Sequence, residues 1–195
     1  MSNEDISVRE KIVLAAIECI EKQGIHAVTT RSIAKEADVN IAAVNYYFGT
    51  KDNLINETLK QTLNHAIMDL NEDLHSAEDV KTALRNFLIY IMEGSLRYPN
   101  IVKANFYEPL MYNNYDALFI KKFNDYFRVF VEKASALSIN ISEDKFKLIL
   151  MQMFGSVMFV SLMPDIFKSL SDLDFKTEAG IRAYIDSLLE AHLKI

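Results

Sequence analysis

The stretch that decides the fold is "TTRSIAKEADVNIAAVNYYFGTKDNL", which runs from Thr29 to Leu54. Its apolar residues recur at helical spacing in two short runs, and Asp38-Val39 between them is typical of a tight turn. Asn40 and Thr50 can each cap the first turn of a helix. Two short helices joined by a tight turn are a helix-turn-helix candidate. The predicted helices cover 31–37, 41–48 and 51 to about 74.

A helical wheel divides the second short helix into two sides. Val44, Phe48 and Tyr47 fall on the inner side. The outer side carries small residues, an amide and a phenol, and it consists of Ala42 and Tyr46, with Ala43 and Asn45 on its flanks. Such a face suits a DNA major groove: alanine methyls can touch a thymine methyl, an asparagine amide fits an adenine edge, and a tyrosine can donate to a phosphate.

The composition of the chain favours long helices. Half of the 195 residues are apolar, whereas Gly (5) and Pro (3) are scarce, which argues against an all-β fold. The single cysteine, Cys19, excludes an intrachain disulfide and fits a reducing compartment. The first residues, "MSNEDISVRE", lack the pattern of a signal peptide, so we expect a cytoplasmic protein. The net charge of −6 disfavours broad binding to nucleic acid or to an anionic membrane, but not a local DNA-reading site.

The helical pattern continues along the whole chain, which predicts an all-α fold. Ser7 begins a capping box and Gly24 ends the first helix, while Pro109 and Asn113-Asn114 indicate a loop. The further predicted helices run from the capping-box pattern at 76–79 to 97, from 100 to 106, from 115 to 130 and beyond, from 143 to 163, and finally through 181–193.

Two of these helices carry more apolar surface than one core needs. The segment "LILMQMFGSVMFVSLM" is too short to span a bilayer and includes Gln152, so a buried helix is the better interpretation and no membrane partner is expected. A helix that is apolar nearly all round must be covered on both sides. We therefore expect a homodimer in which the helices around 143–163 and 177–194 of two chains form a four-helix bundle.

The residues "IVLAAIECIEKQGIHAVTTRSIAKEADVNIAAVNYYFGTKDNLI", Ile12 to Ile55, resemble the DNA-binding domain of TetR/AcrR-type transcriptional regulators. The resemblance implies a helix-turn-helix DNA-binding domain at 1–52 and a helical ligand-binding and dimerisation domain at 53–195. It further implies a homodimeric regulator, most often a repressor, that binds a palindromic operator in double-stranded DNA. A small hydrophobic ligand would move the helix that joins the two domains and release the DNA.

The resemblance also implies which residues touch DNA. The positions that commonly do so in the family are occupied here by Thr30, Asn40, Ala42, Ala43, Asn45, Tyr46, Tyr47 and Lys51, and we add the basic Arg31. Asp38 stands where the family often has glycine, and aspartate tolerates the left-handed conformation that such a turn needs. Ile41 replaces a basic or small residue, and Asn45 replaces an aromatic one, so the operator sequence cannot be carried over from relatives.

Aromatic and methionine side chains in the second predicted domain suit an adaptable apolar cavity. The candidate pocket residues are Tyr90, Glu93, Phe106, Tyr107, Met111, Phe119, Phe123, Phe127, Met151 and Phe154, with Glu93 as a possible polar anchor. Each of these side chains taken alone is more typical of an ordinary core. The four histidines are scattered, so we expect no metal site and no cofactor.

Two other classes of function compete with DNA binding. A helical enzyme would need a nucleophile with a base, a metal cluster or a phosphate loop, and none of these patterns is present, so we expect no enzyme. A protein–protein adaptor that keeps the helix-turn-helix fold without binding DNA remains an alternative. This alternative draws support from the weak positive charge of the motif, because the acidic Glu36 and Asp38 offset most of the charge of Arg31, Lys35 and Lys51.

Overall fold

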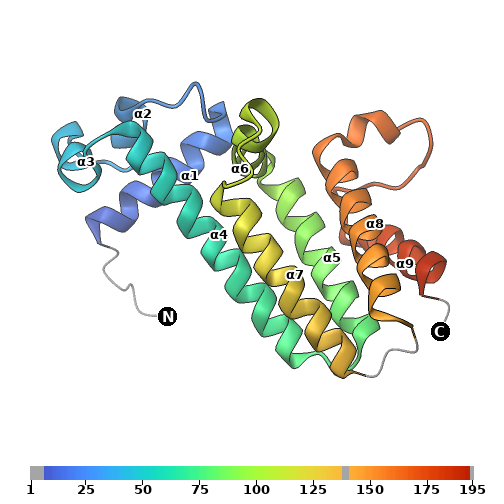
Figure 1. The fold of residues 1–195 in the computed structure, drawn as a ribbon. Coiled ribbons are helices and arrows are strands. Elements are labelled where there is room, and N and C mark those ends of the chain that lie inside the picture. Colours follow the sequence, from blue (N-terminus) through green and yellow to red (C-terminus); the bar gives the residue numbers. More distant parts are fainter. Residues whose placement is uncertain (1–6, 138–140, 194–195) are drawn as a thin grey trace, which may run out of the picture. The chain divides into compact units, whose positions relative to one another are not determined.

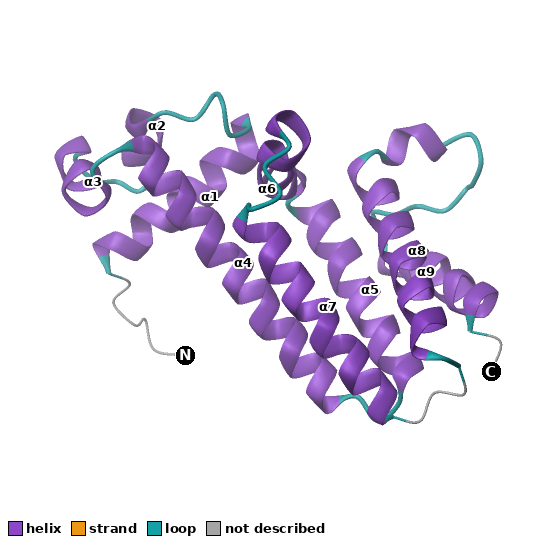
Figure 2. Cartoon of the chain, in the orientation of Figure 1, coloured by secondary structure: helices purple, strands orange, loops and turns teal. Residues whose placement is uncertain are grey.

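The computed structural model describes residues 7–137 and 141–193, and every regular element in these ranges is helical (Figure 2). The all-α prediction is thereby confirmed. The elements are α1 (Val8–Gln23), α2 (Thr30–Glu36), α3 (Ile41–Phe48), α4 (Lys51–Ser76), α5 (Val80–Arg97), α6 (Pro99–Tyr112), α7 (Leu118–Ala136), α8 (Glu143–Leu162), the 3-10 helix η1 (Pro164–Phe167) and α9 (Glu178–His192) (Figure 1).

The chain forms two compact units, which we call unit 1 and unit 2. Unit 1 contains residues up to His65 together with Asn100–Phe119, and unit 2 contains Ala66–Pro99 and Ile120–Ile195. Unit 1 therefore includes α6, although α6 is separated from α1–α3 in sequence by α5. These units follow packing contacts and differ in extent from the predicted domains at 1–52 and 53–195, which remain a prediction about function.

The core of unit 1 is made by α1, α2, α3 and the first part of α4. Its most buried side chains include Ile12, Ile20, Ile33 and Leu54, and α6 adds Ile101. The ends of α1 follow the predicted capping residues: the Ser7 side chain accepts a hydrogen bond from the Glu10 amide, and Gly24 ends the helix at φ 76°. That left-handed backbone favours glycine.

The start of α6 is bonded to the end of α1 within unit 1. Both carboxylate oxygens of Glu21 accept from the Asn100 amide at 3.2 and 3.1 Å, and one of them also accepts from the Ile101 amide at 3.2 Å. The Asn100 side chain donates back to the Glu21 carbonyl at 2.8 Å. First-turn amides of a helix have no partner within the helix, so Glu21 satisfies donors that would otherwise need water.

Three predicted element boundaries were wrong, and one of them is the start of α7, which lies at Leu118 rather than at 115. The loop expected around Pro109 is part of α6, which continues to Tyr112. Proline removes one backbone hydrogen bond and clashes with the preceding turn, but the Pro109 ring is buried and only one further turn follows. The capping box expected at Ser76 is not used either, because α4 runs to Ser76 and Asp79 caps α5 by accepting from the Thr82 amide at 2.9 Å.

Unit 2 is organised around Phe87 of α5. Its ring stacks on Tyr126 and on Phe154, at centroid distances of 5.4 and 6.0 Å, and also contacts Phe127 at 6.0 Å. Phe123 joins the group through Phe154 at 5.7 Å. We call these five residues the aromatic cluster. They come from α5, α7 and α8, so aromatic packing connects three helices in one core.

The helix α8 meets the length and apolarity expected of a membrane span, the one such helix in the described ranges, and 44% of its most apolar window is buried. Its buried side includes Phe146, Met153 and Val157. Both α8 and α9 pack against α5. Ser142 caps α8 and Pro164 begins η1 just after its end, as predicted.

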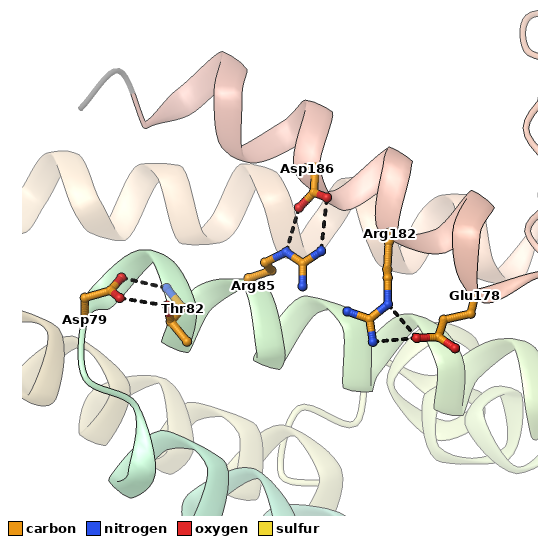
Figure 3. A network of polar contacts seen from close by, with 6 residues as sticks. All are labelled: Asp79, Thr82, Arg85, Glu178, Arg182 and Asp186. Atoms are coloured by element: carbon orange, nitrogen blue, oxygen red, sulfur yellow. Dashed lines mark hydrogen bonds and ion pairs between the residues drawn. The ribbon is translucent and has the colours of Figure 1, made fainter.

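A bidentate ion pair connects α5 to α9 on the surface of unit 2 (Figure 3). Arg85 donates from Nε and Nη2 to the two carboxylate oxygens of Asp186 at 2.6 and 3.0 Å. The guanidinium of Arg85 holds the pKa of Asp186 below its usual value because it bonds the charged form of the carboxyl. Nearby, Arg182 bonds Glu178 within α9, so this second pair connects no other helix (Figure 3).

We predict that Arg85→Met lowers the stability of the protein at neutral pH by about 1 kcal/mol. A carboxyl with a lowered folded-state pKa stabilises the fold fully above its unfolded-state pKa and loses that contribution as the pH falls through the folded-state pKa. The difference between parent and variant should therefore shrink in acid, below about pH 4. Urea unfolding over a pH series measures it.

Arg182→Met is the matched control, because it removes a more exposed pair within one helix and should cost less than about 0.5 kcal/mol. A loss in Arg85→Met that is the same at every pH would contradict the role of the ion pair and would point to lost packing of the arginine stem.

Candidate nucleic-acid interface

The turn between α2 and α3 is fixed by local hydrogen bonds. Thr29 and Ser32 form a reciprocal capping box at the start of α2, in which each side chain accepts from the other residue's amide at 3.0 Å. Asn40 caps α3 by accepting from the Ala42 amide at 2.9 Å. Asp38 adopts the predicted left-handed conformation, with φ 52°. Within the turn itself, the amides of Asp38 and Val39 donate to the carbonyls of Lys35 and Ala34 at 3.3 and 3.0 Å.

The α3 helix has a buried side and an outer side, as the helical wheel predicts. Val44 is 2% exposed and Phe48 is 8% exposed, so both anchor the helix in the core of unit 1. On the outer side Tyr46 is 84% exposed, and Ala42 and Asn45 are also exposed, with Ala43 half-buried. We call the exposed residues Ile41, Ala42, Asn45 and Tyr46 the outer face of α3.

Tyr47 is more exposed to solvent than the prediction that it packs inward implies, with 42% of the residue exposed. Its ring makes an edge contact with Tyr46 at a centroid distance of 5.2 Å and a tilted contact with Phe48 at 6.5 Å. Tyr47 therefore lies between the anchor and the outer face. It supports the orientation of Tyr46 and still offers its own hydroxyl to solvent.

The remaining predicted DNA-contact residues lie at the starts of helices in unit 1. Thr30 is the first residue of α2, with the exposed Arg31 beside it, and Lys51 is the first residue of α4. Thr50 caps α4 by accepting from the Asn53 amide at 3.1 Å, and Gly49 provides the turn from α3 at φ 72°. Helix starts present amides and a positive dipole end, which suits phosphate contacts.

Sequence reasoning missed a supporting contact made by Arg9. Its guanidinium lies 5.2 Å from the centroid of the Phe48 ring and donates to Glu57 at 3.1 Å. These contacts join α1, α3 and α4, and they hold the end of α3 against its neighbours. The hydrogen bonds from Gln61 and Arg9 lower the pKa of Glu57, so this carboxylate stays charged. No local pattern signals a contact between residues 48 positions apart.

The predicted pocket residues are divided between the two units. In unit 2, Phe123, Phe127 and Phe154 belong to the aromatic cluster, and the half-buried Tyr90 donates to Asp69 at 2.8 Å. Burial, and then the Asp69 bond, raises the pKa of Tyr90, which keeps its hydroxyl a donor. Glu93 is exposed, and Met151 lies on the exposed side of α8 rather than in the cluster.

The other four candidates lie in unit 1. Phe106 makes an edge contact with Phe119 at a centroid distance of 4.5 Å, and Tyr107 makes one with His26, also at 4.5 Å. Met111 is exposed. The structure thus brings the phenylalanines of α7 and α8 together with Phe87, a cluster member that the sequence prediction did not include. Among the described residues, no group of three or more His, Cys, Asp or Glu side chains is arranged to hold a metal ion.

Residues 12–58 match the model of the bacterial regulatory proteins of the tetR family. This match covers α1, the capped α2–α3 pair and the start of α4, which is the region that forms the outer face of α3. Within residues 12–58 the chain is therefore similar to the DNA-binding region of the tetR family.

The chain is 33% identical over 66 residues to the HTH-type transcriptional regulator BetI of Vibrio campbellii. That alignment spans 34% of this chain and 33% of BetI, so the chain matches about a third of the length of the curated relative.

The similarity in fold extends over nearly the whole chain. The transcriptional regulator FadR from Bacillus subtilis, solved with stearoyl-CoA, superimposes with a TM-score of 0.63 at 18% identity, covering 94% of this chain and 97% of FadR. A protein from Saccharomonospora viridis, described as a transcriptional regulator and solved with choline, gives a TM-score of 0.73 at 15% identity, with coverages of 93% and 95%.

Proposed function

We propose that this protein is a DNA-binding transcriptional repressor, and that unit 1 inserts the outer face of α3 into the major groove. The observation that carries the proposal is the exposure of Tyr46 and Asn45 on a helix that the buried Val44 and Phe48 anchor in the core. A short helix held at its ends and presenting small and amide-bearing residues fits a groove. In this role the protein works in the cytoplasm, and it binds DNA without catalysing a reaction.

The protein acts as a homodimer through α8 and α9. Leu148, Met151 and Phe159 are exposed large apolar residues on α8, spaced so that they share one face. Gly155 lies on the same face, and a side chain added there would meet nothing within 4 Å in this chain. An apolar helix face with a glycine in it allows a second helix to approach closely. The predicted segment 177–194 matches α9 up to the end of the described residues at 193, and position 194 lies outside them.

Two copies of α3 related by a twofold axis would read a palindromic operator whose half-sites lie about 34 Å apart, one turn of duplex. The motif has little excess positive charge, and Glu36 is paired with Lys22 at 2.9 Å. Affinity then depends on two half-sites bound at once, since linked binding events raise the total affinity by orders of magnitude.

A largely hydrophobic small molecule releases the operator by binding at the aromatic cluster of unit 2. Phenylalanine rings from α5, α7 and α8 meet there, and α5 also carries the Tyr90 hydroxyl, which donates to Asp69 and can still accept a hydrogen bond. An apolar site with few polar groups is typical of small-molecule pockets. FadR with stearoyl-CoA and the Saccharomonospora protein with choline are folds of this kind that bind small molecules, which supports a ligand here.

We predict that Asn45→Ala and Tyr46→Ala each weaken operator binding about tenfold or more, while thermal stability changes little. Both side chains are exposed, so their loss leaves the core intact. Operator selection from random duplexes at low salt supplies the DNA, and a fluorescence titration measures the affinity. Val44→Ala is the matched control in the same helix: it should cost about 2 kcal/mol of stability instead. Selection of no palindromic site would favour the adaptor alternative.

For the dimer, Met151→Glu should convert the protein to a monomer at micromolar concentration, because it places a charge on the apolar face of α8. Sedimentation velocity measures the change. Met68→Glu on α4 is the control, since Met68 is 52% exposed and Met151 is 64% exposed. A dimer that survives Met151→Glu, or dissociates equally in both variants, would rule out the α8 face as the interface.

Stearoyl-CoA should lower operator affinity about tenfold, whereas choline, which lacks a long apolar chain, should not. The measurement is the operator titration with each compound present. Phe127→Ala, which removes one ring of the aromatic cluster, should reduce the effect of stearoyl-CoA. Release by choline alone would contradict a hydrophobic ligand, and binding of stearoyl-CoA without loss of operator affinity would contradict the coupling.

A further inference from the structure

The α3 helix carries no side chain that is charged at neutral pH: its sequence is "IAAVNYYF". This restricts the base pairs that its outer face can read. Guanine presents two acceptors in the major groove and is bound best by arginine or lysine, while cytosine presents a donor that aspartate or glutamate accepts. Neither kind of side chain exists on α3. The basic residues Arg31 and Lys35 belong to α2 instead.

Asn45 carries the amide that remains available on this face. Among the described residues, none hydrogen-bonds to the Asn45 side chain, whereas the amide oxygen of Asn40 is already used to cap α3. A free asparagine amide offers one donor and one acceptor side by side. Adenine presents the complementary pair, the N7 acceptor and the N6 donor, which no other base presents at its major-groove edge.

The neighbours of Asn45 on the outer face are apolar. Ile41 lies four residues before Asn45 and is therefore directly beside it on the helix, and Ala42 occupies the same position relative to Tyr46. Ile41 is 37% exposed although it is a large β-branched residue, and Ala42 is exposed as well. An exposed isoleucine has no hydrogen bond to offer a base, but its methyl groups suit the C5-methyl group of thymine, which is the one apolar group in the major groove.

We propose that the base pairs facing α3 are A·T pairs, with an adenine against Asn45 and thymine methyl groups against Ile41 and Ala42. This inference rests on the proposed function and specifies which base pairs the operator presents to α3. It concerns the α3-facing positions alone; positions near Arg31 are free to contain guanine. Specificity at these positions then depends on one bidentate amide contact and on methyl contacts.

The experiment uses the selected operator duplex and the full-length protein. Each adenine is replaced in turn by 7-deazaadenine, which keeps base pairing but removes the N7 acceptor, and each thymine by deoxyuridine, which removes the methyl group alone. One 7-deazaadenine position per half-site should weaken binding about tenfold. Deoxyuridine should weaken binding about fourfold at one or two adjacent positions, the value expected for one buried methyl group. Replacement of guanines by 7-deazaguanine in the α3-facing positions tests the rival base.

The variants assign each effect to its side chain. Asn45→Ala should bind the parent and the 7-deazaadenine duplex equally. Ile41→Ala should lose its response to deoxyuridine at the position that faces Ile41, while it keeps its response to 7-deazaadenine. Both residues are exposed, and the analogue scan on the parent protein needs no variant at all.

The outcomes separate this inference from the proposed function. Tight binding of a palindrome that is sensitive to 7-deazaguanine and insensitive to 7-deazaadenine would overturn the A·T assignment and leave DNA binding intact. A 7-deazaadenine effect that persists unchanged in Asn45→Ala would overturn the role of that amide. Failure to select any duplex would overturn the proposed function and the assignment with it.

Discussion

The burial of Val44 and Phe48 is the constraint on which the recognition surface depends. A helix of eight residues is far too short to be stable alone, so its position comes from these two anchors and from its capped ends. Once they are buried, helical geometry directs positions 42, 45 and 46 outward with no further interaction needed. Arg9 reinforces the anchor by covering the Phe48 ring and binding Glu57. The chemistry of the outer face can therefore vary without changing the fold.

Features of the fold that depend on local geometry could be predicted from the sequence. Three capping residues act within one turn of their own helix, namely Asn40, Ser142 and Gly24. Asp38 tolerates a backbone conformation that most residues avoid. Each of these residues can therefore be recognised from its type and its position in the sequence. The division of α3 into two sides follows from the helical period alone. The start of α5 was misassigned because both Ser76 and Asp79 can cap a helix, and packing decides between them.

Contacts between distant residues could not be predicted, and they account for most of what the structure adds. Glu21 resembles any acidic residue near the end of a surface helix, yet it caps α6 some 79 positions later. The sequence around Phe87 indicates only that this residue lies on the buried side of a helix. Its place at the centre of the aromatic cluster depends on α7 and α8. The candidate pocket residues were chosen by type, which explains why Met151, an apolar residue on the outside of α8, was grouped with them.

The contribution of α6 to unit 1 has a consequence for how the chain folds during synthesis. The helix-turn-helix is made early, but its core includes Ile101, and the first turn of α6 supplies the partners of Glu21. The helix α5 lies in sequence between the two segments of unit 1, and its apolar side belongs to unit 2. A ribosome delivers residues in order, so unit 1 cannot complete its core before a central helix of unit 2 has also emerged. A fragment cut after residue 65 therefore lacks part of the core of unit 1.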